Sequence, residues 1–152
     1  MKRFALSLTF LAAAAALLGT ASAARATHAV QSKPAAQSRP LTILVKADDQ
    51  HGRKGPDGKW HDAFLPADFR VPVGRMTTIT IVNYDGSAHS MVSASLGLMV
   101  KIPAAKGSKP GRVTFTIKPK IAGKYDWWCG SPCDTWAMTH DGYMRGYITA
   151  TR

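Results

Sequence analysis

The sequence predicts an all-β fold, a Greek-key β-sandwich in a single domain, and three observations support this. Short runs of β-branched and aromatic residues recur along the chain and are separated by Gly and Pro. Two of these runs, residues 77–82 and 113–117, alternate with the period of two that is typical of half-buried antiparallel strands. After residue 23, no stretch of useful length shows the 3.6-residue apolar period of a helix. Many short strands with turn residues between them favour a sandwich.

Residues 1–23 are predicted to be a secretory signal peptide. A positively charged start, Met1-Lys2-Arg3, precedes an apolar run that ends at Leu18, and the small residues Ala21-Ser22-Ala23 follow. The run is shorter and richer in Ala than a comfortable membrane span, which needs about 20 strongly apolar residues. An uncleaved N-terminal anchor is the alternative. We therefore expect a mature chain that begins near Ala24, is periplasmic or secreted, and has no stable membrane span.

Residues 24–40 are predicted to be a disordered tether, because they are rich in Ala, Ser, Gln, Lys and Pro and have almost nothing to bury. The folded domain is predicted to span residues 41–152, with an exposed loop over residues 48–59. Its strands are expected at Leu41–Val45, Phe69–Val73, Met76–Val82, His89–Val92, Val113–Ile117, Gly123–Trp128 and Gly146–Ala150.

The charge of the chain is strongly basic. Lys and Arg number 20 against nine acidic residues, all of them Asp, for a formal net charge of +11. Since Lys2 and Arg3 lie in the predicted signal, about +9 remains on the mature protein. Such a charge can steer acidic partners toward the protein. Nucleic acid is not an expected partner, because the chain is predicted to be exported and its basic residues are scattered.

One predicted loop near the C-terminus concentrates the chemistry of the chain. It contains two thiols, Cys129 and Cys133, the imidazole of His140 and the thioether of Met144, and His89 is available upstream. Thiolate, imidazole and a weaker thioether together suit copper. Zinc also accepts Cys and His but has little use for Met. The sequence therefore predicts a copper site built from these five residues.

These residues and their surroundings resemble a cupredoxin from about Leu41 to the C-terminus. The similarity is greatest to the dinuclear copper (CuA) domain of cytochrome c oxidase subunit II. The matching motifs are Arg70-Val-Pro-Val-Gly74, Ala88-His89-Ser90, Cys129-x3-Cys133 and His140-x3-Met144. The resemblance implies one-electron transfer to or from a redox partner such as a cytochrome, which the positive charge of this chain would steer if the partner is acidic.

The same resemblance implies a set of copper ligands. Two bridging thiolates, Cys129 and Cys133, would hold two copper ions together with His89, His140, Met144 and the backbone carbonyl of Ser131. Two departures from the family pattern stand out. Six residues, 134–139, separate Cys133 from His140, where the family usually has a short gap. Ser131 occupies a position that is usually acidic or aromatic, which argues against a working oxidase subunit.

Other interpretations stay open at this stage. A mononuclear blue copper site would use His89, one Cys, His140 and Met144, and a module that stores or delivers Cu(I) could use the same donors. Two cysteines in an exported protein also commonly form a disulfide. A Cys129–Cys133 bridge would close a small loop, stabilise the fold little and leave the neighbouring His and Met unexplained. The chain shows no nucleophile elbow, phosphate-binding Gly loop or paired carboxylates, so we expect an electron carrier or copper-binding protein rather than a catalyst.

Several neighbouring residues are assigned simpler roles. His61 lies in polar sequence and is expected to be exposed. Met91 and Met99 are expected to pack in the core, whereas Met138, inside the six-residue insertion, could supplement a copper site. Asn83 is expected either to hold the ligand loops by hydrogen bonds or to be an ordinary turn residue.

Overall fold

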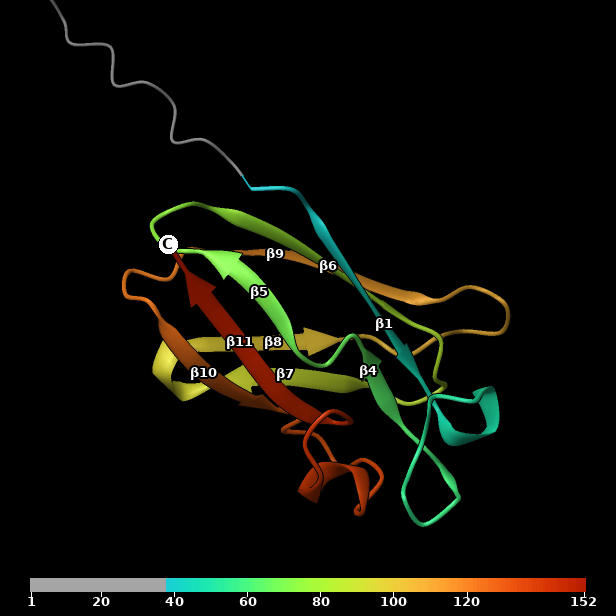
Figure 1. Ribbon diagram of the computed structural model, residues 1–152. Helices are drawn as coiled ribbons and strands as arrows, with labels where there is room; N and C mark the ends of the chain where they lie inside the picture. Colours follow the sequence, from blue (N-terminus) through green and yellow to red (C-terminus); the bar gives the residue numbers. More distant parts are fainter. Residues whose placement is uncertain (1–37) are drawn as a thin grey trace, which may run out of the picture. The chain divides into compact units, whose positions relative to one another are not determined.

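The computed structural model describes residues 38–152, which form two β-sheets (Figure 1). The first sheet has the strand order β4 (Ala63–Leu65), β1 (Leu41–Lys46), β6 (Thr77–Asn83) and β9 (Gly111–Ile117). The second has the order β5 (Phe69–Pro72), β11 (Arg145–Thr151), β10 (Gly123–Trp128), β7 (His89–Ser93) and β8 (Leu98–Ile102). The chain crosses between the sheets after β4, β5, β6, β8 and β9, so the predicted all-β sandwich is confirmed.

Short elements complete the structure. A two-stranded ribbon consists of β2 (Arg53–Lys54) and β3 (Trp60–His61), and the 3-10 turns are η1 (Asp48–Gln50), η2 (Ala94–Leu96) and η3 (Ala137–Thr139). The predicted signal peptide and most of the predicted tether lie outside the described residues. Within residues 38–152, no helix is long and apolar enough to cross a membrane.

Each of the seven predicted strands is present, with ends that differ by at most two residues. The alternation in β6 and β9 predicted antiparallel strands, and the two strands pair with each other in this direction, with Thr77 opposite Ile117 and Asn83 opposite Gly111. Strands β4 and β8 were not predicted, since β4 has only three residues and β8 is an edge strand with exposed side chains. Two pairs, β1 with β6 and β5 with β11, are parallel. The alternation pattern does not reveal these, because strand direction depends on how distant segments meet.

The core lies between the two sheets and is filled by large apolar side chains. Phe64, Ile79, Met91 and Ile148 are fully buried within it. Trp127 is buried with them, its ring 4.7 Å from that of Phe64, and its Nε1 donates a hydrogen bond to the carbonyl of Ala67 at 2.8 Å. Burial of these side chains removes apolar surface from water and is the main stabilising contribution to such a fold.

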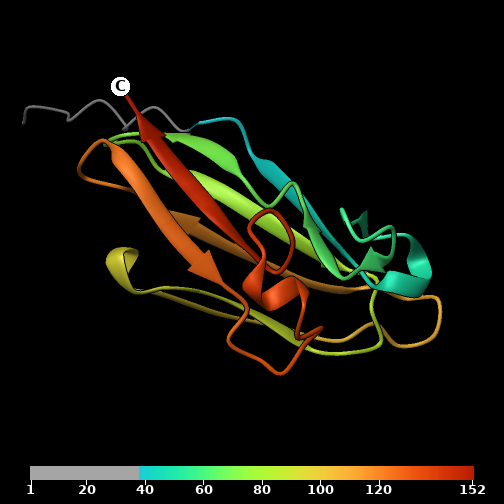
Figure 2. The same ribbon diagram turned by 60° about the horizontal axis from the view of Figure 1, so that its bottom comes forward.

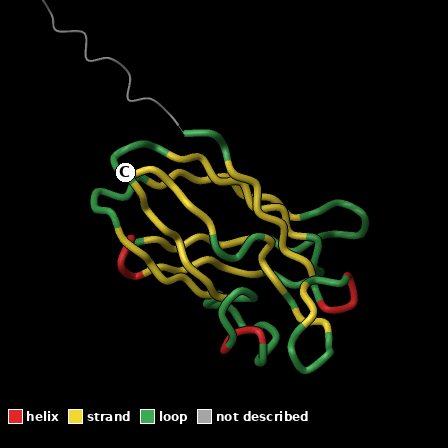
Figure 3. The backbone as a smooth tube through the Cα atoms, viewed as in Figure 1, coloured by secondary structure: helices red, strands yellow, loops and turns green. Residues whose placement is uncertain are grey.

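The loops of the sandwich gather at two opposite ends, which Figure 3 shows as loop segments on either side of the strands. We call one the site end; it comprises the loops over residues 47–62, 84–88, 103–110 and 129–144. The other, the far end, comprises residues 38–40, 73–76, 94–97, 118–122 and 152. In Figure 2 the site end is turned forward, and the segment 129–144 winds across it.

Candidate metal site

His89 is positioned by the loop that precedes β7. The buried side chain of Asn83 shapes this loop, because its Nδ2 donates to the carbonyls of Ser87 at 2.8 Å and Pro103 at 3.0 Å, and its Oδ1 accepts from the backbone N–H of Asp85 at 2.9 Å. The Asp85 carboxylate then lies 2.7 Å from Nε2 of His89. Asn83 therefore holds the loop that carries His89, and Asp85 is a hydrogen-bond partner of His89 that the sequence analysis missed.

The contact with Asp85 determines which nitrogen of His89 faces the thiols. A carboxylate only accepts hydrogen bonds, so Nε2 carries a hydrogen and a neutral His89 keeps its lone pair on Nδ1. Nδ1 lies 3.1 Å from the Sγ of Cys133 and 3.8 Å from the Sγ of Cys129. Such an outer carboxylate is typical of metal-binding imidazoles, since it sets both the tautomer and the ring orientation.

The two cysteines lie side by side in the loop that follows β10. Their Sγ atoms are 2.6 Å apart, and both are free thiols. The carbonyl oxygen of Ser131, between them in sequence, lies 3.1 Å from the Sγ of Cys133 and 3.6 Å from that of Cys129. One imidazole nitrogen and two sulfurs thus meet within 4.8 Å, with a backbone oxygen facing both sulfurs.

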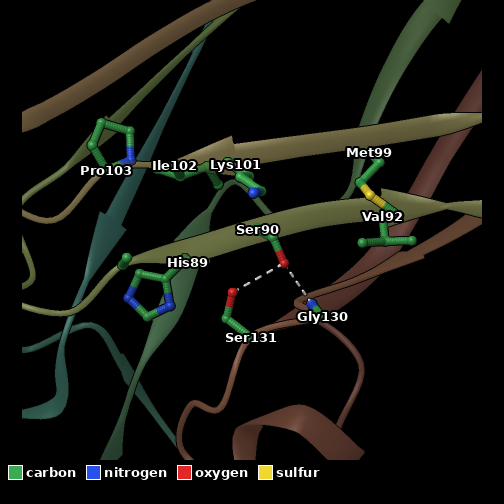
Figure 4. A pocket seen from close by; sticks show the side chains of 10 residues that line it. His89, Ser90, Val92, Met99, Lys101, Ile102, Pro103, Gly130 and Ser131 are labelled. Atoms are coloured by element: carbon green, nitrogen blue, oxygen red, sulfur yellow. Dashed lines mark hydrogen bonds between the residues drawn. The ribbon is translucent and has the colours of Figure 1, made fainter.

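The cysteine loop is held against β7 by Ser90. The Ser90 Oγ accepts hydrogen bonds from the backbone N–H of Gly130 at 2.8 Å and from the hydroxyl of Ser131 at 3.3 Å (Figure 4). A side chain at position 130 would lie only 3.1 Å from Val92, which explains why the smallest residue occupies it. The loop is therefore fixed at its start, where it carries the predicted ligands.

The charge of the thiol pair depends on how Cys129 and Cys133 share a proton. The hydrogen bond from Cys133, with help from His89, lowers the pKa of Cys129 from 9.0 to about 4, whereas the same bond raises the pKa of Cys133. Burial lowers the pKa of His89, but its hydrogen bonds with Cys129 and Asp85 outweigh that effect and raise it above 6.5. Without metal, the pair consists of a Cys129 thiolate and a Cys133 thiol. A thiolate present at neutral pH is the form of cysteine that binds metals.

Met144 lies directly beside Cys129. Strands β10 and β11 pair with Trp128 opposite Arg145, and the backbone N–H of Cys129 donates to the carbonyl of Met144 at 2.8 Å. Opposite residues in an antiparallel pair direct their side chains to the same face. Both side chains are buried, so the thioether of Met144 shares the interior side of this pair with the Cys129 thiol.

His140 lies apart from this group. Its ring is exposed and stacks on Trp136, with ring centroids 3.6 Å apart and an interplanar angle of 7°. Its Nδ1 is 2.7 Å from the carbonyl of Trp136, which makes that nitrogen a hydrogen-bond donor. The structure therefore brings together His89, Cys129 and Cys133, adds Met144 beside Cys129, and leaves His140 on the surface. The role of His140 as a ligand stays a prediction.

The expected exposure of His61 is wrong. The segment 134–139 covers this side chain, which is buried and stacks on Trp136 at 3.9 Å. Its Nδ1 is 2.8 Å from Asp134 and its Nε2 is 3.1 Å from Asp57. Burial lowers the pKa of His61, but hydrogen bonds to these two carboxylates outweigh it and raise the pKa above 6.5. No local pattern could reveal this, because 73 positions separate His61 from Asp134.

Two hollows lie beside the donor group. One, of about 440 Å³, includes His89, Val92, Met99, Pro103 and Ser131 in its lining (Figure 4). Met99 is 76% exposed at its rim, so the expectation that it packs in the core is wrong, whereas Met91 does so. The other, of about 530 Å³, reaches Cys133 between Trp60, His61 and Asp134.

The comparison with protein families agrees with this fold and this donor group. The sequence matches the family of cupredoxin-like domains over residues 7–150. The chain belongs to the cupredoxin-like domain family. The group of His89, Cys129 and Cys133 lies at the site end of this sandwich, at the start of β7 and in the loop after β10. The donors also fit copper chemically, because thiolates and imidazole are ligands that copper prefers.

The chain is also similar to solved structures at low sequence identity. Auracyanin from Roseiflexus castenholzii is 17% identical, with a TM-score of 0.53, and the match covers 77% of this chain and 100% of that one. Rusticyanin from Thiobacillus ferrooxidans is 20% identical, with 76% and 79% covered and a TM-score of 0.49. The metal-binding domain of the Cu(I)-exporting P-type ATPase of Streptococcus pneumoniae is 15% identical, with 78% and 93% covered and a TM-score of 0.48. No curated protein sequence matches the chain.

Proposed function

We propose that this cupredoxin is exported, binds copper between His89, Cys129 and Cys133, and carries single electrons. The observation that carries the proposal is the convergence of Nδ1 of His89 and both Sγ atoms within 4.8 Å. Copper bound there would supply the one-electron exchange. The surrounding residues keep the donors in place: Asp85 orients the imidazole, and Ser90 holds the cysteine loop.

Two copper ions are favoured over one. In the CuA domains that this chain resembles, two thiolates bridge the ions and a carbonyl between the cysteines is a further ligand. Here the carbonyl of Ser131 faces both sulfurs, at 3.1 and 3.6 Å, and Met144 lies beside Cys129. The proposal also takes His140 as the second imidazole. That ring would have to leave Trp136 to reach the thiols, since it is stacked and exposed in the structure.

The surface position of His140 favours a second candidate function. With His140 on the surface, two thiols and a single imidazole meet at the site, and soft donors of this kind suit Cu(I). One hollow reaches Cys133 and another reaches His89, so the donor group is accessible from two hollows. A protein that stores or delivers Cu(I) in the same compartment would use these features. A mononuclear blue copper site would use one of the cysteines and leave the other spare.

A redox partner is proposed to dock at the site end, where the donors lie closest to the surface. Among the residues described, this end includes exposed basic side chains at Lys59, Lys106 and Lys109, in loops that also contain seven Asp residues. The net positive charge of the whole chain would bring an acidic protein such as a cytochrome toward it, and these lysines would contact that protein in a short-lived complex. Increasing the salt concentration should then slow electron exchange with that partner, because it screens surface charges.

Copper stoichiometry measured together with optical absorption and electron paramagnetic resonance tests the proposal. Two copper ions per chain, with a mixed-valence signal spread over both nuclei, are expected. One copper with a blue spectrum would indicate the mononuclear site, and tightly bound Cu(I) without a stable oxidised form would indicate copper handling. Cys133→Ser should abolish the two-nucleus signal. Two titratable thiols in metal-stripped protein would exclude the disulfide alternative.

A further inference from the structure

The charge of the domain is distributed unevenly between its two ends. None of the nine Asp residues lies in the far-end segments defined above; seven lie in loops of the site end, and Asp68 and Asp126 are the others. Several site-end carboxylates are already paired, Asp141 with Arg145 and Asp85 with His89. In the far-end segments, the exposed charged side chains that the structure describes are all basic. They are Arg39, Arg75, Lys118, Lys120 and Arg152.

Apolar side chains protrude among these basic residues. Ile121 is 72% exposed at the tip of the turn between β9 and β10, directly after Lys120, and Met76 is 41% exposed on the neighbouring turn. A hydrogen bond of 2.8 Å from the backbone N–H of Gly74 to the carbonyl of Pro119 joins the two turns. Figure 1 shows both turns beside the C-terminus. A shallow hollow of about 350 Å³ lies next to Ile121 and contains Leu96 and Tyr125.

We propose that the far end binds the surface of an anionic membrane. Lysines attract negatively charged lipid headgroups, and an apolar side chain that protrudes between them can insert at the headgroup boundary. The described part of this end contains no Asp or Glu side chain that would repel such a surface. This inference does not depend on copper binding, and it concerns the end of the sandwich opposite the metal site.

The entry of the chain into the domain supports a membrane as the occupant. The N–H of Ser38 donates to the carbonyl of Met76 at 3.0 Å, and its hydroxyl donates to Thr77 at 2.6 Å. The sequence that leads back to the predicted export signal therefore joins the domain at the far end. A domain docked in this way directs its site end away from the bilayer, where a partner in the aqueous compartment can reach it.

Vesicle co-sedimentation of the purified full chain tests the proposal. Binding to phosphatidylcholine vesicles should increase when phosphatidylglycerol is included, and added salt should reverse the increase. The phosphatidylcholine arm measures any contribution of the predicted signal sequence. The double variant Lys118→Glu/Lys120→Glu should weaken the phosphatidylglycerol-dependent binding at least about tenfold, since each basic residue near the surface contributes to attraction. Ile121→Ser should weaken binding less and leave it salt-sensitive.

The matched control is Lys106→Glu/Lys109→Glu, which makes the same charge change at the site end. It should retain the binding of the unchanged protein. Equal losses in both double variants would overturn the proposal, because net charge alone would then account for the binding. The proposal would also be overturned if phosphatidylglycerol did not increase vesicle binding, or if the protein bound heparin but not vesicles. Copper content and thermal unfolding of each variant separate a failure of this surface from a failure of the fold or of the metal site.

Fluorescence quenching by brominated phosphatidylglycerol tests the orientation. All four tryptophans lie in the site half of the domain, at Trp60, Trp127, Trp128 and Trp136. Their emission should therefore be unaffected when the protein is bound to these vesicles. Ile121→Trp should add emission that the brominated lipid quenches. Quenching of the unchanged protein would contradict an orientation in which the site end faces away.

Discussion

The loop after β10 consists of two regions that are ordered in different ways. Residues 129–133 are tied to the sandwich itself: Cys129 hydrogen-bonds to Met144, and Gly130 to Ser90 on β7. Residues 134–140 are ordered mainly by contacts with the site-end loops, above all the stack of His61, Trp136 and His140. The first region carries donors already oriented toward one point. The second carries a predicted ligand, His140, whose ring is exposed and stacked on Trp136. Proximity in sequence to the cysteines therefore does not by itself bring a side chain next to the thiols.

The largest effect is expected from Cys129→Ser. Cys129 is buried, forms the thiolate of the pair and contacts both Cys133 and His89, so its loss should reduce copper bound per chain to near zero. Metal analysis after gel filtration measures this. Ser131→Ala is the control, because it keeps the backbone carbonyl and should retain copper. Retention of copper by Cys129→Ser would show that the donors lie elsewhere.

His89→Ala and His140→Ala compare the two regions directly. Loss of the oriented imidazole should lower copper affinity at least about 100-fold, since even residues that only support a ligand contribute 10–100-fold. His140→Ala should lower copper affinity about tenfold or less, because the affinity gained from this ligand is offset by breaking its stack on Trp136. Competition with a chelator of known affinity gives both values. Equal losses would mean that residues 134–140 rearrange when copper binds.

The pKa of Cys129 offers a test without metal. In metal-stripped protein, the ultraviolet absorbance should show one thiolate per chain from neutral pH down to about pH 4. An ordinary cysteine would already be protonated below about pH 9. Because folding lowers the pKa of Cys129, its thiolate contributes to the free energy of unfolding. This contribution is complete above about pH 9 and is lost as the pH falls toward 4. In Cys133→Ala, which removes the donor, the thiolate should titrate at higher pH, since the hydrogen bond from Cys133 is the main cause of the shift. An unchanged titration would assign the shift to His89.

A smaller effect is expected from His61→Ala. Its removal leaves Asp134 without its imidazole partner and Trp136 without one stacking face, which should lower the free energy of unfolding by about 1 to 3 kcal/mol. Denaturant unfolding measures the change. His51→Asn is the control, since His51 is exposed, lies outside this stack and has a positive φ of 57° that Asn also adopts. Copper affinity should change less than in His89→Ala, and an equal loss would show that the two regions form one unit.

The class of fold and the three side chains that converge at the site could be predicted from short stretches of sequence. Alternation in residues 77–82 and 113–117 predicted half-buried antiparallel strands, and both are present as β6 and β9. Cys129, Cys133 and His89 were predicted as ligands from their residue types and positions, and they meet within 4.8 Å. These features are local: the period of a strand and the spacing of a loop are visible in a short stretch.

Features that depend on contacts between distant segments can be seen only in the three-dimensional structure. Asp85 as the partner of His89, the burial of His61 between Asp57 and Asp134, and the surface position of His140 require loops that meet across the site end. The parallel pairs and the segregation of acidic residues from the far end likewise emerge only when strand directions are known. Hydrogen bonds and charge interactions act over a few ångströms in space, and a linear pattern does not specify which distant residues come within that range.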